Sequence, residues 1–288
     1  MTYPFQTTEY RTVFKKHFVA DPSTIVLLNN TEYELLSDKR AVLMGMKLVL
    51  NGQEITDFGE IEHPSQETIS SHVQTLLHTY KAPFVQYDFI REDSPTFQLL
   101  AKLTSFPPIL KEVSPFIILP TTWDAYLESL ERTNRKELKR KLNRLNTTAH
   151  RFRSIDKPSD TAFEEFIRLH RLSDSSKSAF MTEGMKSFFY DLYTSHFPAW
   201  NMQLVFLDIE DKPAASLLYF ENNEEVLLYN SGYDPAYKFY SAGLLLCAHL
   251  IQQGIEKKKM KFDFLRGNER YKYDLGGVDC KLYQFMFT

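Results

Sequence analysis

The residues best suited to chemistry gather near the C-terminus, in the run Phe262-Asp-Phe-Leu-Arg-Gly-Asn-Glu-Arg-Tyr-Lys272. An aspartate can accept a proton, a tyrosine can donate one, and arginine or lysine can bind an anionic group. The run begins as a strand, and α/β proteins commonly place ligands just after a strand's C-terminal end. The candidates are Asp263 and Tyr271 as proton carriers, and Arg266, Arg270 and Lys272 as substrate contacts.

A turn before this run is the second candidate feature. Lys238-Phe-Tyr-Ser-Ala-Gly243 sets small residues at the start of an amphipathic helix expected at 242–258. The first amides of a helix have no intrahelical partner and the helix dipole is positive there, so the site suits an anion such as a pyrophosphate. The alternative is an ordinary helix start capped by Ser241. The predicted anion contacts are Lys238, Tyr240, Ser241, Ala242 and Gly243.

Three further side chains are candidates. Tyr229, on a strand predicted at 226–230, is a second possible proton donor. His170 and Arg171, on a helix predicted at 161–172, are candidates for contact with an acceptor. Each also has a structural explanation, because a lone helical histidine is more often a satisfied surface or core residue, and a tyrosine often forms the edge of a core.

The elements that must position these residues alternate along the chain. Asn51-Gly52 is a strong hairpin signal between two apolar runs, and apolar spacing elsewhere separates helices from strands. We predict strands at 41–50, 53–58, 84–91, 200–209, 214–220, 226–230 and 281–287, and helices at 66–80, 95–103, 122–145, 161–172, 183–195 and 242–258.

A short internal repeat relates two of these segments. Tyr87-Asp-Phe-Ile-Arg91 matches Phe262-Asp-Phe-Leu-Arg266 in character at every position and in identity at three. Each copy follows an amphipathic helix after a short turn, which favours duplication of one α/β unit. The repeat weakens the case for Asp263 as a base, because Asp88 occupies the same place without a comparable phosphate turn. A shared structural role explains both aspartates.

Positive charge is concentrated between Arg132 and Arg153, which contains nine Lys or Arg and one Glu. Leu138, Leu142 and Leu145 form one apolar stripe in it. The favoured interpretation is a helix packed on the body of the protein with a solvated basic face. The alternative is binding of an anionic partner: a sugar nucleotide, a charged polysaccharide precursor or tRNA.

Composition sets wider bounds. With 288 residues, 43% of them hydrophobic, the chain can build one large or two medium domains, and its net charge of −3 is too balanced for a general polyanion binder. Only Cys247 and Cys280 are cysteines, and no Cys/His spacing suggests a metal site. Cys247 lies in an apolar helical stripe, typical of a buried, inert thiol. No signal peptide or membrane-spanning run is visible, so a cytoplasmic setting is expected.

Several of these segments resemble a known family. Tyr233-Asp-Pro, Tyr240-Ser-Ala-Gly-Leu-Leu-Leu246 and Phe262–Lys272 resemble the C-terminal signature of the FemAB-like, or BioF2-like, acyltransferases of the GNAT N-acyltransferase superfamily. Trp123-Asp-Ala-Tyr-Leu-Glu-Ser-Leu130 with Asn134–Leu142 resembles the family's middle helix, and Leu169-His-Arg171 falls where members often carry a similar tripeptide. The resemblance covers most of the chain and is specific mainly after Trp123.

The resemblance implies an α/β fold of two tandem GNAT-like halves, at 1–120 and 121–288, each a mixed, mostly antiparallel sheet flanked by helices. The second half is expected to hold the donor. GNAT enzymes hold the pyrophosphate of coenzyme A with Gln/Arg-x-x-Gly-x-Gly/Ala, and Lys238, Ser241 and Gly243 fall on its first, fourth and sixth positions. Ser241 in place of glycine departs from the motif and makes close backbone approach less certain.

The expected function is transfer of an acyl group, acetyl in the first instance, from a coenzyme A thioester to an amine of a small molecule, sugar or cell-envelope precursor. Tyr271 or Tyr229 would protonate the departing thiolate. One alternative is an aminoacyl-tRNA-dependent transferase of the FemAB peptidoglycan type, and another is a non-catalytic GNAT-fold binding module. No metal and no DNA partner are expected. The acceptor, the acyl chain length, the general base and the oligomeric state stay open.

Overall fold

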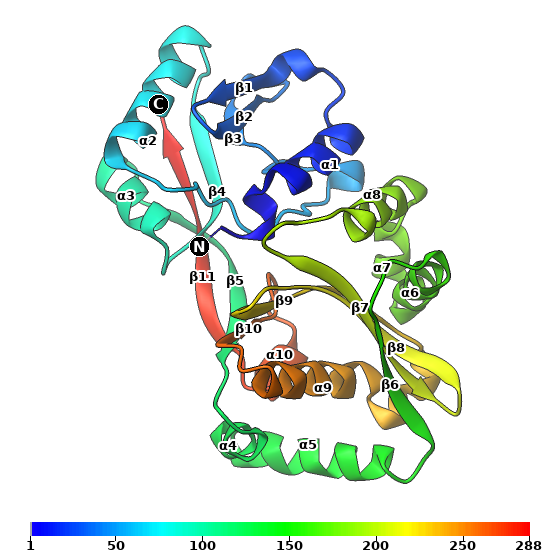
Figure 1. The fold of residues 1–288 in the computed structure, drawn as a ribbon. Coiled ribbons are helices and arrows are strands. Elements are labelled where there is room, and N and C mark those ends of the chain that lie inside the picture. The colour runs from blue at the N-terminus through cyan, green and yellow to red at the C-terminus, as the bar shows by residue number, and fades with distance from the viewer. Residues whose placement is uncertain (1) are drawn as a thin grey trace. The chain divides into compact units, whose positions relative to one another are not determined.

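The structure is a computed structural model that describes residues 2–288. It divides into two compact units (Figure 1). Unit 1 comprises the described residues up to Ser114 together with Cys280–Thr288, and unit 2 comprises Pro115–Asp279. These units differ from the expected halves 1–120 and 121–288, because the last strand of the chain pairs with a strand of unit 1.

Unit 1 is a mixed sheet flanked by helices. Its strands follow the order β1-β2-β3-β4-β11; β3 and β4 are parallel, and the other neighbours are antiparallel. The crossover between the parallel strands contains α2, as parallel pairing requires. The elements are η1 (Pro4–Gln6), α1 (Thr8–Phe18), η2 (Pro22–Thr24), β1 (Ile25–Leu28), β2 (Thr31–Leu35), β3 (Ala41–Leu43), η3 (Leu50–Gly52), α2 (Gln66–Gln74), η4 (Thr75–Thr79), β4 (Val85–Arg91), α3 (Pro95–Leu103) and β11 (Val278–Phe287).

Unit 2 is built the same way around a larger sheet. Its strands follow the order β5-β10-β9-β8-β7-β6, with β9 and β10 parallel and the others antiparallel. The elements are β5 (Ile109–Ile118, shared between the units), α4 (Trp123–Ser129), α5 (Arg132–Leu145), β6 (His150–Ile155), α6 (Asp160–Ser173), α7 (Ser175–Phe180), α8 (Glu183–Thr194), β7 (Asn201–Ile209), β8 (Lys212–Glu221), β9 (Glu225–Tyr233), η5 (Pro235–Tyr240), α9 (Ala242–Glu256), β10 (Lys261–Asp263) and α10 (Arg270–Asp274).

The two units share one strand pattern. The pattern is seen in the series β1-β2-β3-β4-β11 and β7-β8-β9-β10-β5. In each, the first three strands pair antiparallel, the third and fourth pair parallel, and the fourth and fifth pair antiparallel. The repeat at Tyr87 lies in β4 and that at Phe262 begins in β10, which are the corresponding strands. The expected fold class, an α/β protein with mixed, mostly antiparallel sheets flanked by helices, is confirmed.

Helices cover both faces of the unit 2 sheet. Figure 1 shows α6, α7 and α8 on one face and α9 on the other, with α5 packed outside α9. Leu245, Leu246 and Ile251 of α9 are buried against the strands, because the helix presents apolar residues on most of its surface. Leu138 and Leu145 of α5 join the same core, so the basic helix packs through the predicted apolar stripe.

Two sequence predictions were wrong. The predicted hairpin at Asn51-Gly52 does not form: β3 ends at Leu43 and Leu50–Gly52 is a single 3-10 turn. Carbonyls after that turn accept hydrogen bonds from side chains and not from a neighbouring strand. The Ile55 carbonyl, for example, accepts one from the Tyr10 hydroxyl at 3.0 Å.

The helix predicted at 122–145 is two helices, because Leu130 and Glu131 between α4 and α5 adopt extended backbone and Leu130 is buried in the core. Within residues 2–288, no helix is both long and apolar enough to cross a membrane.

Candidate active site

The parallel strands β9 and β10 pair only briefly. Their contact runs from Glu225–Lys261 to Leu227–Asp263. Beyond it β9 continues to Tyr233 against β8, whereas the chain after β10 turns away and the Phe264 N–H bonds to the carbonyl of Pro115 at 2.9 Å. Beyond Leu227, β10 therefore no longer pairs with this edge of β9, and the edge lies beside the N-terminus of α9.

A cavity of about 570 Å³ lies at this opening, within unit 2. Its volume falls in the range of roughly 300–1,000 Å³ that is usual for small-molecule and cofactor sites. Four segments meet there: the start of α7, the end of β9, the turn into α9 and the start of α10. The lining residues are Asp174, Ser176, Lys177, Ser231, Gly232, Tyr233, Lys238, Ser241, Ala242, Gly243, Leu244, Cys247, Glu269 and Tyr271.

The predicted anion turn forms one wall of this cavity. Ser241 adopts the left-handed conformation (φ 57°, ψ 44°) that glycine would take there. Its side chain does not cap α9, so the alternative of a helix start capped by Ser241 is not what the structure shows. Its carbonyl accepts the Leu245 N–H at 3.0 Å. The amides of Ala242, Gly243 and Leu244 precede that first intrahelical bond and lie at the wall. The positive end of α9 thus meets the cavity.

Four of the five predicted turn residues line the cavity, and Tyr240 does not. The Tyr240 ring packs against the core of unit 2 and meets the Phe239 ring at 5.2 Å between centroids. Lys238 supplies a cation at the cavity wall, as the spacing of the turn predicts.

Replacing Ser241 by glycine is expected to raise the free energy of unfolding by about 0.5 kcal/mol. A left-handed residue other than glycine carries strain of about 1 kcal/mol, which the greater chain entropy of glycine offsets in part. Urea unfolding measures the change. Ser178→Gly, within helix α7, is the matched control and is expected to lose stability, because glycine disfavours a helix. A loss with Ser241→Gly as well would contradict the argument from strain.

Tyr271 is placed at the cavity and Tyr229 is not. Burial, as the largest cause, raises the pKa of Tyr271 well above its usual value, with added contributions from Cys247 and Glu269. The phenol therefore stays protonated and able to donate. The Tyr229 ring packs between Phe189 and Phe220, with centroids 5.5 and 5.4 Å away.

Lys177 is a cavity residue that the sequence analysis missed. Its ammonium donates to the Ser231 carbonyl at 2.6 Å and is 3.1 Å from the Ser231 hydroxyl. Burial lowers the pKa of Lys177, while Asp174 and Glu269 partly oppose that effect. Lys177 and Ser231 lie 54 residues apart and no local pattern joins them, so the sequence carried no signal for this contact.

Cys247 also lines the cavity, yet burial raises the pKa of its thiol to about 12. The neutral thiol agrees with the expectation of an inert cysteine.

Asp263 lies outside the cavity lining and is fully buried. One of its carboxylate oxygens accepts the Leu265 N–H at 2.9 Å, and the other is 3.0 Å from the Lys261 ammonium. These contacts suit the structural role that the repeat suggested. In unit 1, Asp88 likewise accepts from Gln86 and Gln284.

The two helical candidates for acceptor contact serve packing within unit 2. His170 is 1% exposed, and burial, as the largest cause, lowers its pKa to about 3, so the imidazole is neutral. Arg171 donates to the Met181 carbonyl and to Glu183. A contact between either side chain and an acceptor stays a prediction.

The cations after β10 have different surroundings. Lys272 is 2% exposed, and its ammonium holds the loop together by donating to the carbonyls of Leu265, Arg266 and Gly267 at 3.1, 2.6 and 3.2 Å. The Arg270 side chain is 93% exposed and lies 3.7 Å from Asp274. None of Arg266, Arg270 and Lys272 lines the cavity, so their substrate contacts also stay predictions.

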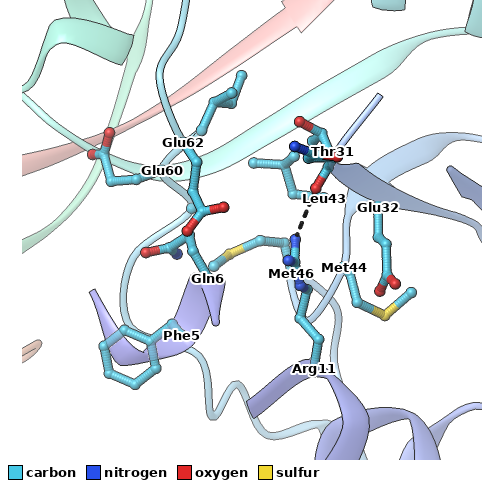
Figure 2. Close-up of a pocket in the computed structure, with 13 residues that line it drawn as sticks. Phe5, Gln6, Arg11, Thr31, Glu32, Leu43, Met44, Met46, Glu60 and Glu62 are labelled. Carbon is cyan, nitrogen blue, oxygen red and sulfur yellow. Dashed lines mark hydrogen bonds between the residues drawn. The ribbon is translucent and has the colours of Figure 1, made fainter. Parts of the chain in front are cut away.

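Unit 1 contains hollows of a different character. Figure 2 shows Arg11 extending between Gln6 and Glu32 in a cavity of about 20 Å³, which is room for little more than a water molecule. A wider groove of about 670 Å³ lies beside Lys47 and Leu48, but its lining residues include neither the N-terminus of an α-helix nor a tyrosine. The unit 2 cavity alone combines the predicted anion turn with a proton donor among the cavities of residues 2–288 described here.

Part of the sequence matches a known protein family. Residues 132–273 match the model of the acetyltransferase (GNAT) domain family, and that segment includes every residue lining the unit 2 cavity. No curated protein matches the sequence.

Solved structures resemble the fold at low sequence identity. FemX is 10% identical, with a TM-score of 0.65, over 99% of this chain and 92% of that one. The C-terminal domain of a protein described as a candidate lysylphosphatidylglycerol synthetase from Agrobacterium fabrum is 9% identical, with a TM-score of 0.62, over 98% and 90%. L-PGS from Bacillus licheniformis is 13% identical, with a TM-score of 0.59, over 97% and 91%.

The sequence signature, the fold and the family match therefore agree: residues 132–273 form an acetyltransferase domain of the GNAT family, and the chain is a GNAT-type acyltransferase.

Proposed function

We propose that the unit 2 cavity binds an acyl-CoA, acetyl-CoA in the first instance, and transfers the acyl group to an amine of a small molecule, sugar or cell-envelope precursor. One observation carries the proposal. The N-terminus of α9, which has no side-chain cap, faces a cavity, and this cavity lies beside the edge of β9 with which β10 no longer pairs. Pyrophosphate on the amides of Ala242 to Leu244, with Lys238 nearby, satisfies donors and charge together.

The proposed reaction needs three events. The neutral amine attacks the thioester carbonyl, the resulting oxyanion collapses, and the carbon–sulfur bond breaks to release a thiolate. Tyr271 donates its proton to that thiolate. The nitrogen of the former amine releases its extra proton to solvent, from which Tyr271 is reprotonated. The Lys177 ammonium, fixed on Ser231 at the cavity wall, adds positive potential where negative charge develops.

Calorimetric titration of the full chain with acetyl-CoA tests donor binding. We expect saturable binding in the micromolar range, which is typical of enzyme substrates, and a marked loss of affinity when free pyrophosphate competes. Absence of binding at millimolar acetyl-CoA would overturn the proposal.

Replacing Tyr271 by phenylalanine is expected to slow thiol release from acetyl-CoA about 100-fold, which is a usual contribution of general acid catalysis. Acetyl-CoA affinity should stay within about twofold, because the hydroxyl is needed only as the thiolate leaves. The rate is measured with a thiol reagent over a panel of primary amines and water.

Tyr273→Phe is the matched control for Tyr271→Phe, since Tyr273 is on the same helix with its hydroxyl bound to Asp279. Equal losses in the two variants, or a wild-type rate for Tyr271→Phe, would remove Tyr271 from the mechanism.

A second candidate is aminoacyl transfer from tRNA. It is favoured by the basic face of α5 and by the FemAB-like resemblance, since FemAB relatives use aminoacyl-tRNA. Tight tRNA binding that weakens steeply with salt, together with no binding of acetyl-CoA, would select it. Failure of both ligands would instead favour a non-catalytic binding module.

A further inference from the structure

Two lysines line the unit 2 cavity among the residues that the structure describes, Lys177 and Lys238. Lys238 is exposed and lies on the turn into α9, where the proposed pyrophosphate binds. Lys177 is half-buried on α7, and its ammonium is held on Ser231 near the end of β9. Lys177 is therefore a cavity amine that is fixed on the strand and not on the anion turn.

Lys177 shares its surroundings with Tyr271. Burial lowers the pKa of Lys177, and Glu269 and Cys247 are among the groups that oppose this effect. Burial raises the pKa of Tyr271, and the same two residues raise it further. Electrostatic interactions of this kind weaken with distance. The lysine amine and the tyrosine hydroxyl therefore face the same part of the cavity.

The hydrogen bonds of Lys177 leave its nitrogen able to react. An ammonium has three N–H donors. After loss of one proton, the neutral amine keeps two N–H groups and gains a lone pair. One N–H group is enough to hold the nitrogen on the Ser231 carbonyl, 2.6 Å away. The lone pair is then free to attack a group in the cavity.

We propose that Lys177 is a self-acylation site, whose amine takes the acetyl group of bound acetyl-CoA when no acceptor amine occupies the cavity. The inference rests on the proposed function. In that function Tyr271 protonates the departing sulfur, and the thioester carbonyl carbon is one bond from that sulfur. The carbonyl carbon therefore lies in the part of the cavity that Lys177 shares with Tyr271.

The step is an ordinary amide-forming transfer. The Lys177 ammonium first loses a proton to solvent. Its nitrogen then bonds to the carbonyl carbon, the carbon–sulfur bond breaks, and the thiolate takes the proton of Tyr271. The nitrogen releases a second proton to solvent, from which Tyr271 is reprotonated. The product amide is uncharged, so the cavity loses the positive potential of Lys177.

Mass spectrometry of the full chain after incubation with acetyl-CoA, without added amine, tests the proposal. We expect one acetyl group per chain, which peptide mapping assigns to Lys177. It should form at least about 100-fold faster than acetyl groups on exposed lysines, because the bound thioester is held beside the amine. The rate should rise with pH, since only the neutral amine attacks. Coenzyme A should suppress acetylation of Lys177 by competition and leave that of exposed lysines unchanged.

Two variants control for the identity of the amine. Lys177→Arg keeps the positive charge but removes the nucleophile, so it should bind acetyl-CoA in calorimetry without the fast acetylation. Lys186→Arg is the matched control, because Lys186 is a partly buried lysine of α8 that is bound to Glu164 and does not line the cavity. It should be acetylated at Lys177 as fast as the wild type. Peptide mapping of the wild type identifies the site independently of both variants.

Three results would overturn the self-acylation site. Binding of acetyl-CoA to the wild type without acetylation of Lys177 would remove the site and leave the proposed function intact. Absence of acetyl-CoA binding would remove both. Acetylation of Lys177 that is no faster than that of Lys238, or that coenzyme A does not suppress, would be chemical acetylation independent of the cavity.

Discussion

Replacing Gly243 by aspartate should weaken acetyl-CoA binding at least 100-fold while leaving the protein slightly more stable. The nearest atoms to a side chain at this position belong to the Tyr233 side chain, 3.8 Å from the new Cβ, so the fold has room for it. A carboxylate in the first turn of α9, which has no acidic residue there, stabilises the helix dipole by about 0.3–1 kcal/mol. The same charge repels a bound pyrophosphate.

Opposite effects on stability and binding make this result diagnostic. Urea unfolding and calorimetry are run on the same preparations. Gly243→Asn is the matched control, because it has the same size as aspartate without the charge. We expect the asparagine variant to bind acetyl-CoA at least tenfold better than the aspartate variant. Equal affinities in the two would show that bulk, not charge, matters; wild-type affinity in Gly243→Asp would place the donor elsewhere.

Replacing Gly232 by alanine should destabilise unit 2 by about 3 kcal/mol. The new Cβ would lie 2.3 Å from the His170 amide nitrogen, 2.6 Å from the Leu169 carbonyl carbon and 2.7 Å from the His170 Cα. These are backbone atoms of α6, and they cannot rotate away as a side chain would. The end of β9 must separate from α6, which costs packing on both sides.

Urea unfolding followed by circular dichroism measures this loss. Gly243→Ala is the control, since its Cβ meets only ordinary contacts and alanine favours a helix. We expect the control to match or exceed wild-type stability. The displaced β9 also carries Ser231, which holds Lys177, so Gly232→Ala should lose acetyl-CoA affinity too. A stability change below about 1 kcal/mol would mean that the β9–α6 contact is looser than the structure shows.

Several features of the candidate site could be predicted from the sequence because each depends on residues that are close together in the chain. The turn from Lys238 to Gly243 combines small residues with a following apolar helix, and four of its residues line a cavity in the structure; anion binding there stays a prediction. Tyr271 follows a strand by a few residues, so chain order alone brought it near the end of that strand. The stripe Leu138, Leu142 and Leu145 likewise predicted how the basic helix packs.

Burial and hydrogen bonding were harder to predict than the order of the elements. Lys272 and Asp263 look like site residues in sequence; the fold buries both, and their roles in the site stay predictions. Asn51-Gly52 looks like a hairpin, yet the Ile55 carbonyl just beyond it accepts a hydrogen bond from the Tyr10 hydroxyl of α1. At Asn51-Gly52, hydrogen bonds made on folding outweigh a local turn preference that is worth about 1 kcal/mol or less.

The sequence by itself determined the strand–turn–helix–strand order around the site, the family signature and the position of the anion turn, since these depend on spacing along the chain. Only the tertiary structure decided that Lys177 joins the cavity, that Gly232 allows β9 to touch α6, and that Asp263 is removed from it. The contacts of Lys177 with Ser231 and of Gly232 with His170 join segments tens of residues apart, and their energies exist only once the sheet and helices have packed.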